Sequence, residues 1–427
     1  MQGLTSVNTR QRLLQLYQRL LVEIRGDRLV AQALQSTSLK SEKIVLLASG
    51  KAAASMVRGA VQILGNRIID ARVITKAGHC QGLEEETGIR CLEAGHPLPD
   101  AHSLEAGQAL LEWLPRLPVE VSLLVLTSGG TSALVEVLPQ ATSLEALVHL
   151  NQWLLGRGLD IHAINRIRRS VSCIKGGGLL ACVPPMIPVE HLILSDVPGD
   201  NLAIIGSGLF VATATESGIE TDTLTGSAAL PDWVQAMQQA AVGCRAWQAK
   251  SRSNHRVNHQ IISSNTRACQ RLVELATQAN QSDVYLHRPP LAGDAGLQGW
   301  AIASYLRKQA PTGLHIWGGE TAVVLPLQPG RGGRNQHLAL AAAQELAGTE
   351  HISLLAVATD GSDGPTDDAG ALVDGGTLGR GKAEGLEAGR VLQQADAGHF
   401  LEASGDLVSS GVTGTNVMDI VLAFKGR

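Results

Sequence analysis

The sequence predicts an α/β protein, and three observations support this fold class. Glycine is abundant at 47 of 427 residues while aromatic residues make up only 3%, a balance that suits helices packed closely on a sheet with tight turns. Residues 318–374 follow the order apolar run, Gly/Arg loop, Ala/Leu-rich helix, apolar run and acidic loop, which is the order of an α/β layer. The length gives room for two or three domains, and we expect two.

Charge and hydropathy exclude several classes of partner. The chain has 35 basic and 39 acidic residues with no basic block, so neither nucleic acid nor an anionic membrane surface is expected. No apolar run reaches the length of about 18 residues that a membrane span needs, and residues 1–28 have the spacing of an amphipathic helix rather than a signal peptide. The six cysteines lack CxxC spacing and are expected to be reduced, mostly buried thiols. A cytoplasmic protein with a small-molecule partner fits these features.

The first βα unit places a lysine at a strand-to-helix turn. Residues 43–49 form a buried-strand pattern, and Gly50 and Lys51 lead into an Ala-rich helix. A lysine there can reach a phosphate above the carboxyl edge of the sheet. Ala52 stands where a P-loop has Ser or Thr, so this turn is not a P-loop, and an ordinary surface lysine is the alternative.

A second turn follows the apolar strand 122–126. Ser128, Gly129, Gly130, Thr131 and Ser132 open a helix there, so their backbone amides can form a nest for an anion, and we favour phosphate. A serine nucleophile elbow would need G-x-S-x-G, which is absent.

The loop after residue 92 holds His96 between Gly95 and Pro97, where it could contact substrate, transfer a proton or simply make a structural hydrogen bond.

Further polar groups follow in the first half of the chain. A basic helix with Asn165, Arg168 and Arg169 runs into a glycine cluster beside Lys175, a candidate cationic wall or a solvated helix face. Asp196 ends an apolar strand and could accept a proton from a substrate hydroxyl.

Residues 218–259 have a weak pattern that predicts a linker. His255 and His259 lie in this stretch at i,i+4 spacing, but they lack the Glu of a zinc protease pair, so the spacing is incidental. The apolar run at 261–262 and the helix pattern that follows it predict the start of a second βα series.

The Gly/Arg loop 329–335 leads directly into a predicted helix. Close backbone approach at glycine, the helix N-terminus and the guanidinium of Arg331 or Arg334 together suit a carboxylate or phosphate. A solvated turn is the alternative.

The acidic loop follows the next buried strand. Asp360, Asp363, Asp367 and Asp368 crowd the strand end, and hard oxygens suit Mg²⁺. An acidic turn with capping aspartates is the alternative, and the spacing does not match an EF-hand.

Taken together, eight motifs resemble those of the MOFRL-type glycerate 2-kinases. They are SGKAAASM at residue 49, TSGGTSAL at 127, INRIRRSVSCIKGG at 164, LSDVPGD at 194, GGET at 318, GRGGRNQ at 330, ATDGSDGPTD at 358 and GVTGTNV at 411. The resemblance implies a larger Rossmann-like doubly wound domain at 1–240 and a smaller domain at 241–427, with the MOFRL-type region at about 312–424, around one cleft. It also implies ATP and Mg²⁺, with D-glycerate phosphorylated to 2-phosphoglycerate. Three residues depart from the family pattern: Thr131, Leu209 and His337.

We therefore assign roles to the candidate residues. Lys51 would stabilise transition-state charge, Arg334 would hold the glycerate carboxylate, and Asp196 would act as base. Asp360 and Asp363 would bind the metal or its waters. The remaining substrate- or ATP-binding candidates are Ser128, Gly129, Gly130, Ser132, Lys175, Glu320, Arg331, Asn335 and Thr413.

Several alternatives stay open. The site of phosphorylation, the 2- or the 3-hydroxyl, is open, as is assembly as a homodimer. A hydroxypyruvate reductase would need a nicotinamide site, yet no G-x-G-x-x-G follows a strand. A non-catalytic sugar-acid binding protein is the third possibility. If the kinase assignment holds, we expect closure of the two domains about a hinge at 218–259.

Overall fold

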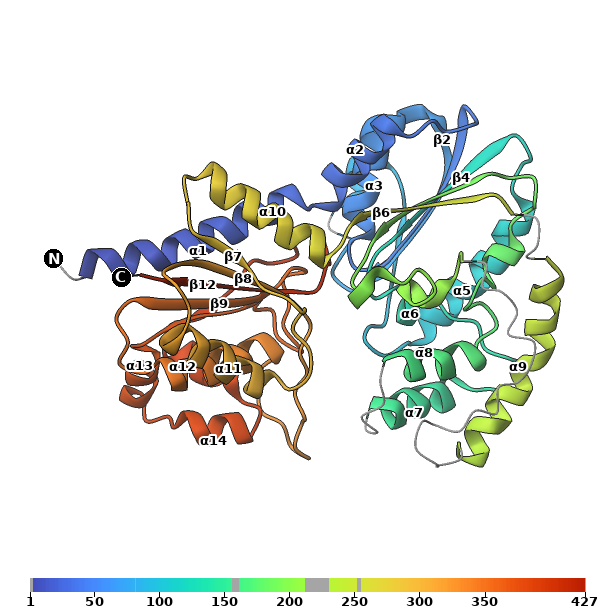
Figure 1. The fold of residues 1–427 in the computed structure, drawn as a ribbon. Coiled ribbons are helices and arrows are strands. Elements are labelled where there is room, and N and C mark those ends of the chain that lie inside the picture. Colours follow the sequence, from blue (N-terminus) through green and yellow to red (C-terminus); the bar gives the residue numbers. More distant parts are fainter. Residues whose placement is uncertain (1–2, 81, 156–160, 212–229, 252–254, 427) are drawn as a thin grey trace. The chain divides into compact units, whose positions relative to one another are not determined.

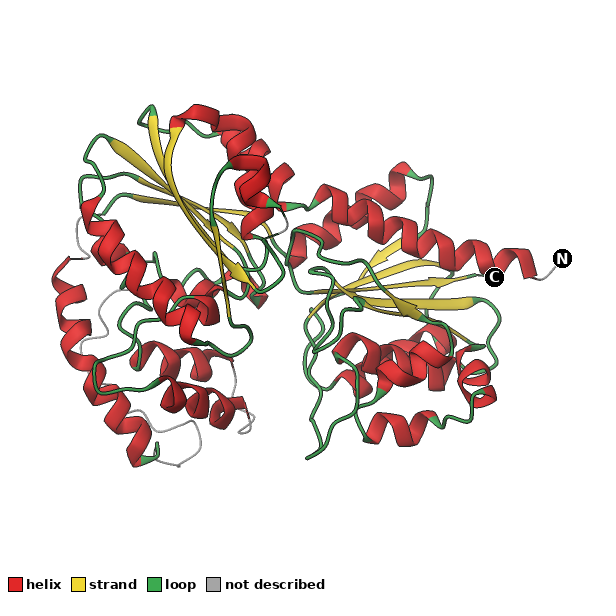
Figure 2. Cartoon of the chain, turned by 180° about the vertical axis from the view of Figure 1, so that it is seen from behind, coloured by secondary structure: helices red, strands yellow, loops and turns green. Residues whose placement is uncertain are grey.

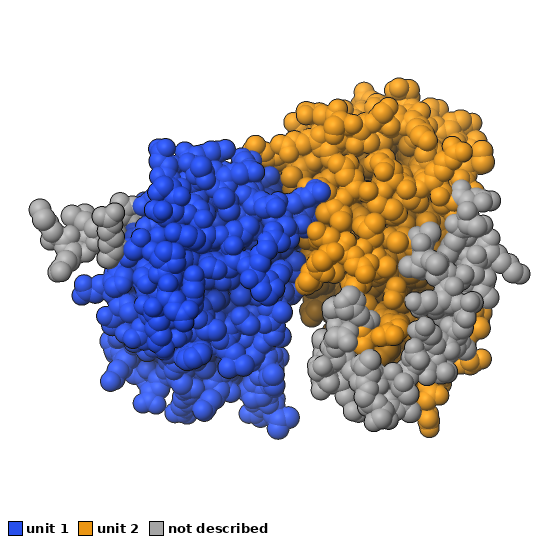
Figure 3. Space-filling view, in the orientation of Figure 1, with its two compact units in different colours: residues 1–25, 263–427 blue, residues 26–262 orange. Residues whose placement is uncertain are grey.

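The computed structural model describes residues 3–80, 82–155, 161–211, 230–251 and 255–426. The chain forms two compact units, residues 26–262 and residues 1–25 together with 263–427 (Figure 3). This division differs from a boundary at 240/241. Helix α1 (Gly3–Glu23) joins the C-terminal unit because one face of it, with Leu13, Tyr17 and Leu20, is almost fully buried.

The unit of residues 26–262 has one six-stranded sheet. Its strands are β1 (Lys43–Ser49), β2 (Ile68–Lys76), β3 (Cys91–Ala94), β4 (Val121–Thr127), β5 (Val189–Leu194) and β6 (Val257–Ser263). They lie in the order β3-β2-β1-β4-β5-β6, and the pairs from β3 through β5 are parallel (Figure 1). This order is that of a doubly wound Rossmann sheet, so the predicted fold class is confirmed for this unit.

Helices cover both faces of this sheet (Figure 2). They are α2 (Gly26–Ser36), α3 (Ala53–Leu64), α4 (Leu83–Thr87), α5 (Ala101–Trp113), α6 (Thr131–Leu134), α7 (Leu144–Leu155), α8 (Ile161–Ser170) and α9 (Asp232–Ser251). Strand β1 supplies Leu46 to one apolar core with Met56 of α3, and Leu47 to the opposite core with Leu110 of α5. A strand buried on both faces reads as a continuous apolar run, as the sequence KIVLLAS does.

The predicted linker at 218–259 is partly wrong. Residues 218–229 and 252–254 lie outside the described residues, but residues 232–251 form helix α9, and the linker's last residues begin strand β6. Strand β6 belongs to the first sheet rather than starting a second βα series. The sequence has few apolar residues at 255–260 because β6 is an edge strand, only partly buried over most of its length.

The second unit has a mixed sheet. Its strands are β7 (Val284–Leu286), β8 (Gly313–Gly319), β9 (Ile352–Ala358), β10 (Gly370–Asp374), β11 (Leu407–Val408) and β12 (Asp419–Lys425). They lie in the order β11-β10-β9-β12-β8-β7, with β12 antiparallel to both β9 and β8. Asp419, the first residue of β12, pairs with Gly319 of β8 and Ala358 of β9. The start of β12 and the ends of β8 and β9 therefore meet at one edge.

Helices α1 and α10 (Asn265–Gln278) lie on one face of the second sheet, and α11 (Ala295–Lys308), α12 (Arg334–Leu346) and α14 (Ala388–Gln393) lie on the other (Figure 1). The short helices α13 (Thr377–Ala383) and α15 (Ala397–Ala403) complete the unit. Helices α11 and α12 cross so closely that a Cβ at Gly299 would lie 2.1 Å from the Leu338 carbonyl oxygen. The Ala-rich α12 thus packs as the composition predicted. None of the described helices combines the length and hydropathy of a membrane span.

The prediction of six reduced cysteines is wrong for four of them. Cys80 pairs with Cys91, and Cys173 pairs with Cys244. Cys182 and Cys269 are free and buried, as predicted. The irregular spacing gave no sign of the two disulfides because each pair is brought together by the packing of the first unit, across 11 and 71 positions of the chain.

Candidate active site

Two loops of the first unit interlock at the carboxyl ends of β1 and β4, where the strand order reverses. Open α/β sheets bind ligands at this position. The Lys51 amide donates to the Gly129 carbonyl at 2.9 Å, and the Ala52 amide donates to Ser128 Oγ at 3.0 Å. A Cβ at Gly50, whose φ is +118°, would lie 2.2 Å from Ser128 Oγ, so only glycine fits there. The sequence-predicted Lys51 turn and Ser128–Ser132 turn therefore form one structure.

His96 and Lys51 both lie beside Gly130. A Cβ built at Gly130 would lie 3.0 Å from the His96 ring and 3.3 Å from Lys51 Cγ. Gly130 has φ +90° and is half-buried, so its backbone is accessible between a cationic side chain and an imidazole. The structure thus brings together three of the polar features that the sequence singled out in separate loops.

The turn after β4 offers backbone donors. The Ser128 amide donates to the Ser49 carbonyl at 2.9 Å. Within the described chain, the amides of Gly129 and Gly130 donate no hydrogen bond. The Thr131 hydroxyl donates to the Ser128 carbonyl at 2.8 Å and so stabilises the turn. The amides of Gly129 and Gly130 are adjacent, and Gly130 has a left-handed backbone conformation. Successive amides in such a turn form the kind of nest that binds anions.

Buried His191 contacts Thr127, the residue that precedes this turn. The sequence reasoning did not identify it. Its Nε2 lies 2.8 Å from Thr127 Oγ1, and its Nδ1 lies 3.0 Å from His259 Nδ1. Burial, together with His259, lowers the pKa of His191 to about 3, so the ring is neutral. His259 therefore pairs across strands, whereas His255 contacts the Val183 carbonyl at 2.7 Å. The i,i+4 spacing of these histidines has no joint role here.

Lys175 forms a buried ion pair beside the small cavity that Ser132 also lines. Its ammonium pairs with Glu136, and the two side chains are only 3% and 1% exposed. Glu136 also accepts from Ser172 Oγ at 2.5 Å and from the Val137 amide at 3.0 Å. This network argues for a structural role of Lys175 rather than the ligand-binding role predicted. The signal that could have revealed it is the glutamate in the middle of the apolar run ALVEVL.

Arg168 borders the same buried network. It lines a small cavity with Ser132 and Lys175, and its Nε is buried without a hydrogen-bond partner in the described structure. Burial lowers the pKa of Arg168, while Glu136 opposes that shift. Of the predicted cationic wall, the structure therefore places Arg168 and Lys175 in one buried cluster.

Asp196 lies two residues after β5, the strand beside β4, so it shares the carboxyl edge with Lys51. It is half-buried. Ser132 Oγ lies 2.7 Å from Ser207 Oγ, which ties the β4 turn to the loop that follows Asp196. Leu209, which we expected to depart from the family pattern, is buried in the apolar core.

In the second unit, Arg334 is held by two carboxylates at the edge where β12 begins. Its Nε and Nη2 donate to the two oxygens of Asp419 at 2.5 and 3.0 Å, and its Nη1 lies 2.9 Å from Glu320 Oε1. Burial alone would lower the pKa of Arg334, but Asp419 and Glu320 raise it above its ordinary value, so the guanidinium is permanently charged. Sequence reasoning missed Asp419, whose signal was a single charge at the head of an apolar strand.

Asp363 caps helix α12 instead of facing an open metal site. Its oxygens accept from the backbone amides of Asn335 at 3.0 Å and Gln336 at 2.8 Å, and from the Asn335 side chain at 3.2 Å. Burial and the charge of Asp419 raise the pKa of Asp363 to about 7, against the effect of these donors. Asn335, a predicted ligand-binding residue, is thereby engaged with Asp363.

Asp360 and Thr413 lie at the end of β9. Asp360 is 7% exposed and accepts the Ser362 amide at 3.1 Å, and the Thr413 hydroxyl donates to the Thr359 carbonyl at 2.6 Å. Tyr17 of α1, which sequence reasoning treated only as an apolar position, donates to the Ala358 carbonyl at 2.7 Å. Burial is the main cause that raises its pKa above the ordinary value. Among the described residues, no three His, Cys, Asp or Glu side chains form a metal cluster.

Arg331 contacts a different set of carboxylates from Arg334. It pairs with Glu402 at 2.6 Å and Asp368 at 3.1 Å, and its amide donates to Asp396 at 2.8 Å. Its side chain is 46% exposed. Of the two arginines in the Gly/Arg loop, Arg334 contacts the start of β12, whereas Arg331 contacts Asp368, two residues before β10.

His337, which we expected to depart from the family pattern, lies in α12. Its Nδ1 is buried without a hydrogen-bond partner in the described structure, and burial lowers the pKa of the ring. A Cβ at Gly296 of α11 would lie 3.3 Å from His337 Nε2, so the ring fills the space between two helices. The His337 side chain therefore contributes to the packing of α11 against α12.

Comparisons with known proteins agree with this architecture. Residues 313–419 match the MOFRL family, and residues 12–238 match a domain of unknown function, DUF4147. The chain is 34% identical over 414 residues to a D-glycerate 2-kinase of Thermotoga maritima, covering 93% of each chain. It is 32% identical over 412 residues to a glycerate 2-kinase of Pyrococcus horikoshii, covering 94% of this chain and 91% of the other.

A solved structure extends the likeness to the fold. The crystal structure of glycerate kinase from Thermotoga maritima superposes with a TM-score of 0.79 at 32% identity, covering 98% of this chain and 99% of the other. The similarity therefore spans both units. The chain belongs to the MOFRL-type glycerate 2-kinase family of enzymes.

Proposed function

We propose that this protein transfers the γ-phosphoryl group of ATP to the 2-hydroxyl of D-glycerate. The observation that carries the proposal is the 34% identity to a D-glycerate 2-kinase over 93% of both chains. The geometry of the first unit supports it because an anion nest with an adjacent lysine lies at the switch point of a Rossmann-ordered sheet. Phosphoryl transfer depends mainly on such positioning and charge stabilisation.

The turn after β4 is our candidate for the ATP phosphates. The amides of Gly129 and Gly130, which have no acceptor within the described chain, would donate to phosphate oxygens, and Ser132 borders the same turn. Lys51 lies next to Gly130 and would stabilise the negative charge of the transferring phosphoryl group. His96, which also lies beside Gly130, would donate a hydrogen bond to the same anion.

Arg334 is our candidate for the glycerate carboxylate. Its guanidinium is oriented by the bidentate pair with Asp419, and its third nitrogen faces Glu320, whose side chain is 40% exposed. A substrate carboxylate would replace Glu320 on that nitrogen and leave the Asp419 pair in place. Glu320 would then act as an exchangeable partner that keeps the arginine directed toward the strand ends.

The proton of the attacking hydroxyl needs an acceptor. Asp196 remains our candidate base because it lies at the carboxyl edge of the first sheet and is half-buried. A Mg²⁺ ion would be bound by one protein carboxylate rather than by several, because both oxygens of Asp363 already accept hydrogen bonds from the backbone amides of α12. Asp360 would supply that carboxylate, and a magnesium ion held mainly by phosphates and water would offset phosphate charge.

The proposal is tested with the purified protein, ATP, Mg²⁺ and D-glycerate, followed by phosphorus NMR of the product. A 2-phosphoglycerate signal, absent when L-glycerate replaces D-glycerate, is expected. A 3-phosphoglycerate signal would overturn the proposed position of phosphorylation. Oxidation of NADH by hydroxypyruvate in place of ATP turnover would support a reductase instead. No reaction with either substrate pair would leave a binding protein as the better interpretation.

A further inference from the structure

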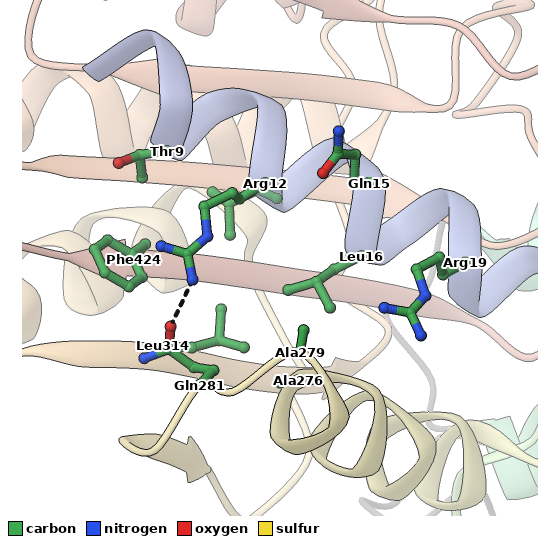
Figure 4. A pocket seen from close by; sticks show the side chains of 11 residues that line it. Thr9, Arg12, Gln15, Leu16, Arg19, Ala276, Ala279, Gln281, Leu314 and Phe424 are labelled. Carbon is green, nitrogen blue, oxygen red and sulfur yellow. Dashed lines mark hydrogen bonds between the residues drawn. The ribbon is translucent and has the colours of Figure 1, made fainter. Parts of the chain in front are cut away.

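The second unit has a pocket between α1 and the end of α10, lined by none of the residues proposed for phosphoryl transfer. Helix α1 forms one wall with Arg12, Gln15, Leu16 and Arg19, and Ala276 and Ala279 at the end of α10 form the other (Figure 4). Leu314 of β8 and Phe424 of β12 form the floor. Arg12, Leu16 and Arg19 lie four and then three positions apart, so they share one face of α1.

The buried side of α1 holds the helix in place. Tyr17 is 1% exposed and Leu20 is fully buried, and Leu13, which also lines the pocket, is 1% exposed. The Tyr17 hydroxyl adds the hydrogen bond to the end of β9. Because this wall is fixed by the fold, a ligand would not have to order it, and a preformed pocket loses less affinity to ordering.

The pocket is cationic. Its lining includes Arg12 and Arg19 but no Asp or Glu. Arg12 donates to Gln281 Oε1 at 3.0 Å and lies 5.6 Å over the Phe424 ring, so its orienting partners are neutral. Within the part of the chain that the structure describes, neither arginine forms an ion pair. Elsewhere in this unit, Arg10 and Arg380 are paired with carboxylates.

Between the two arginines the surface is apolar. Figure 4 shows Leu16 between the two arginine side chains, facing the alanines of α10. The cavity has a volume of about 110 Å³, which suits a single ring or a short branched chain rather than a long acyl chain or a dinucleotide. A ligand that matches both features has a small apolar body and one anionic group.

We propose that this pocket binds a small organic anion, an aromatic or branched carboxylate or sulfonate, with its apolar body on Leu16, Leu314 and Phe424 and its anionic group on Arg12 or Arg19. The site is separate from the phosphoryl-transfer residues, so its existence does not depend on the proposed function. Arginine is suited to the anionic group because its planar fork can donate two hydrogen bonds to it.

The test measures binding directly, with benzenesulfonate as the probe and the full chain in low-salt buffer. Benzyl alcohol supplies the same ring without the charge, and methanesulfonate supplies the charge without the ring. Isothermal titration or saturation-transfer NMR should show binding of benzenesulfonate at least about tenfold tighter than of either control, since a hydrogen bond to a charged group is worth about one power of ten in affinity.

Variants place the probe in the pocket. Arg12→Gln together with Arg19→Gln should weaken benzenesulfonate binding about tenfold. Ala279→Phe keeps both charges but fills the cavity from an exposed position, and should abolish binding. Arg390→Gln, which removes an exposed arginine of α14 outside the pocket, is the matched control and should leave affinity unchanged. Melting curves verify that each variant folds.

Any of three results would overturn the proposal. One is equal binding of benzenesulfonate and benzyl alcohol, because the arginines would then contribute nothing. Another is binding that persists in folded Ala279→Phe, because the probe would then occupy another surface. A shift of probe affinity in Arg390→Gln equal to that in the double arginine variant would mean that only the net charge of the unit matters, which also contradicts a defined site.

Discussion

Replacing Lys175 with methionine should destabilise the first unit strongly while leaving its surface unchanged. The ammonium and Glu136 form an ion pair in which both side chains are at least 97% buried. Methionine matches the length of the lysine stem but leaves the carboxylate without its cation. Breaking a buried pair in this way costs about 3–5 kcal/mol, because a charge remains in a place with little water.

The thermal consequence follows from the size of the unit, residues 26–262. A domain of that size loses about 2–4 °C in its melting midpoint for each kcal/mol, so the expected loss is roughly 6–20 °C. Adding Glu136→Gln should restore most of it, since the amide still accepts from Ser172 and carries no charge. Glu86→Gln, which breaks an exposed pair with Arg58 in the same unit, should leave the midpoint nearly unchanged.

The assay must resolve the two units, because their unfolding need not be a single transition. Hydrogen exchange followed by mass spectrometry of peptides from β4 and α8 reports on the first unit, and peptides from β9 and α12 serve as the internal reference. The reasoning is refuted if Lys175→Met keeps its exchange protection and melting midpoint but raises the KM for ATP. Lys175 would then bind the nucleotide, as the sequence alone suggested.

Three further predictions concern the proposed reaction and the second unit. Lys51→Ala should lower kcat by about a hundredfold or more with the melting midpoint retained, because it removes one charge from the phosphoryl site; a matched loss of stability would contradict a catalytic role. Arg334→Lys should raise the KM for glycerate far more than the KM for ATP, as lysine loses the bidentate fork; the reverse pattern in initial-rate kinetics would move Arg334 to the nucleotide. Asp363 has a folded pKa of about 7, above its unfolded value of about 3.9, so its ionisation destabilises the folded unit progressively as pH rises from about 4 to 7. Asp363→Asn should flatten that part of the stability curve, and an unchanged slope in pH-dependent melting would count against the raised pKa.

The sequence was most informative where local pattern and burial coincide. Strands β1, β4 and β9 are buried along nearly their whole length, so they read as uninterrupted apolar runs, and each ends in the polar loop that carries a candidate residue. The first part of edge strand β6 was not predicted as a strand, because the strand is only partly buried over most of its length and lacks a continuous apolar run. The place of α1 in the C-terminal unit could not be deduced either, since amphipathic periodicity specifies a buried face but not its partner.

For the site, the sequence revealed positions but not pairings. Lys51 and the Ser128–Ser132 turn could be located because carboxyl ends of parallel strands share one edge. Asp419 and Glu136 could not, because their partners lie 85 and 39 positions away and a lone acid in an apolar run has no local signature of its partner. Without the Glu136 pair, Lys175 resembled a free cation. Without its hydrogen bonds to the first amides of α12, Asp363 resembled a metal ligand.

These pairings change how the cations of the family motifs can act. A buried lysine matched to a glutamate presents no net charge to a ligand, whereas Lys51 lies beside a glycine whose amide has no acceptor within the described chain. Arg334 is intermediate: the Asp419 pair fixes the guanidinium, and the Glu320 contact, with a 40% exposed carboxylate, is the one that a ligand can replace. An incoming carboxylate that displaces Glu320 exchanges one ion pair for another, so its net gain is small. Removing that competitor with Glu320→Gln should therefore lower the KM for glycerate if Arg334 binds it, while a rise in KM would show that Glu320 itself holds the substrate.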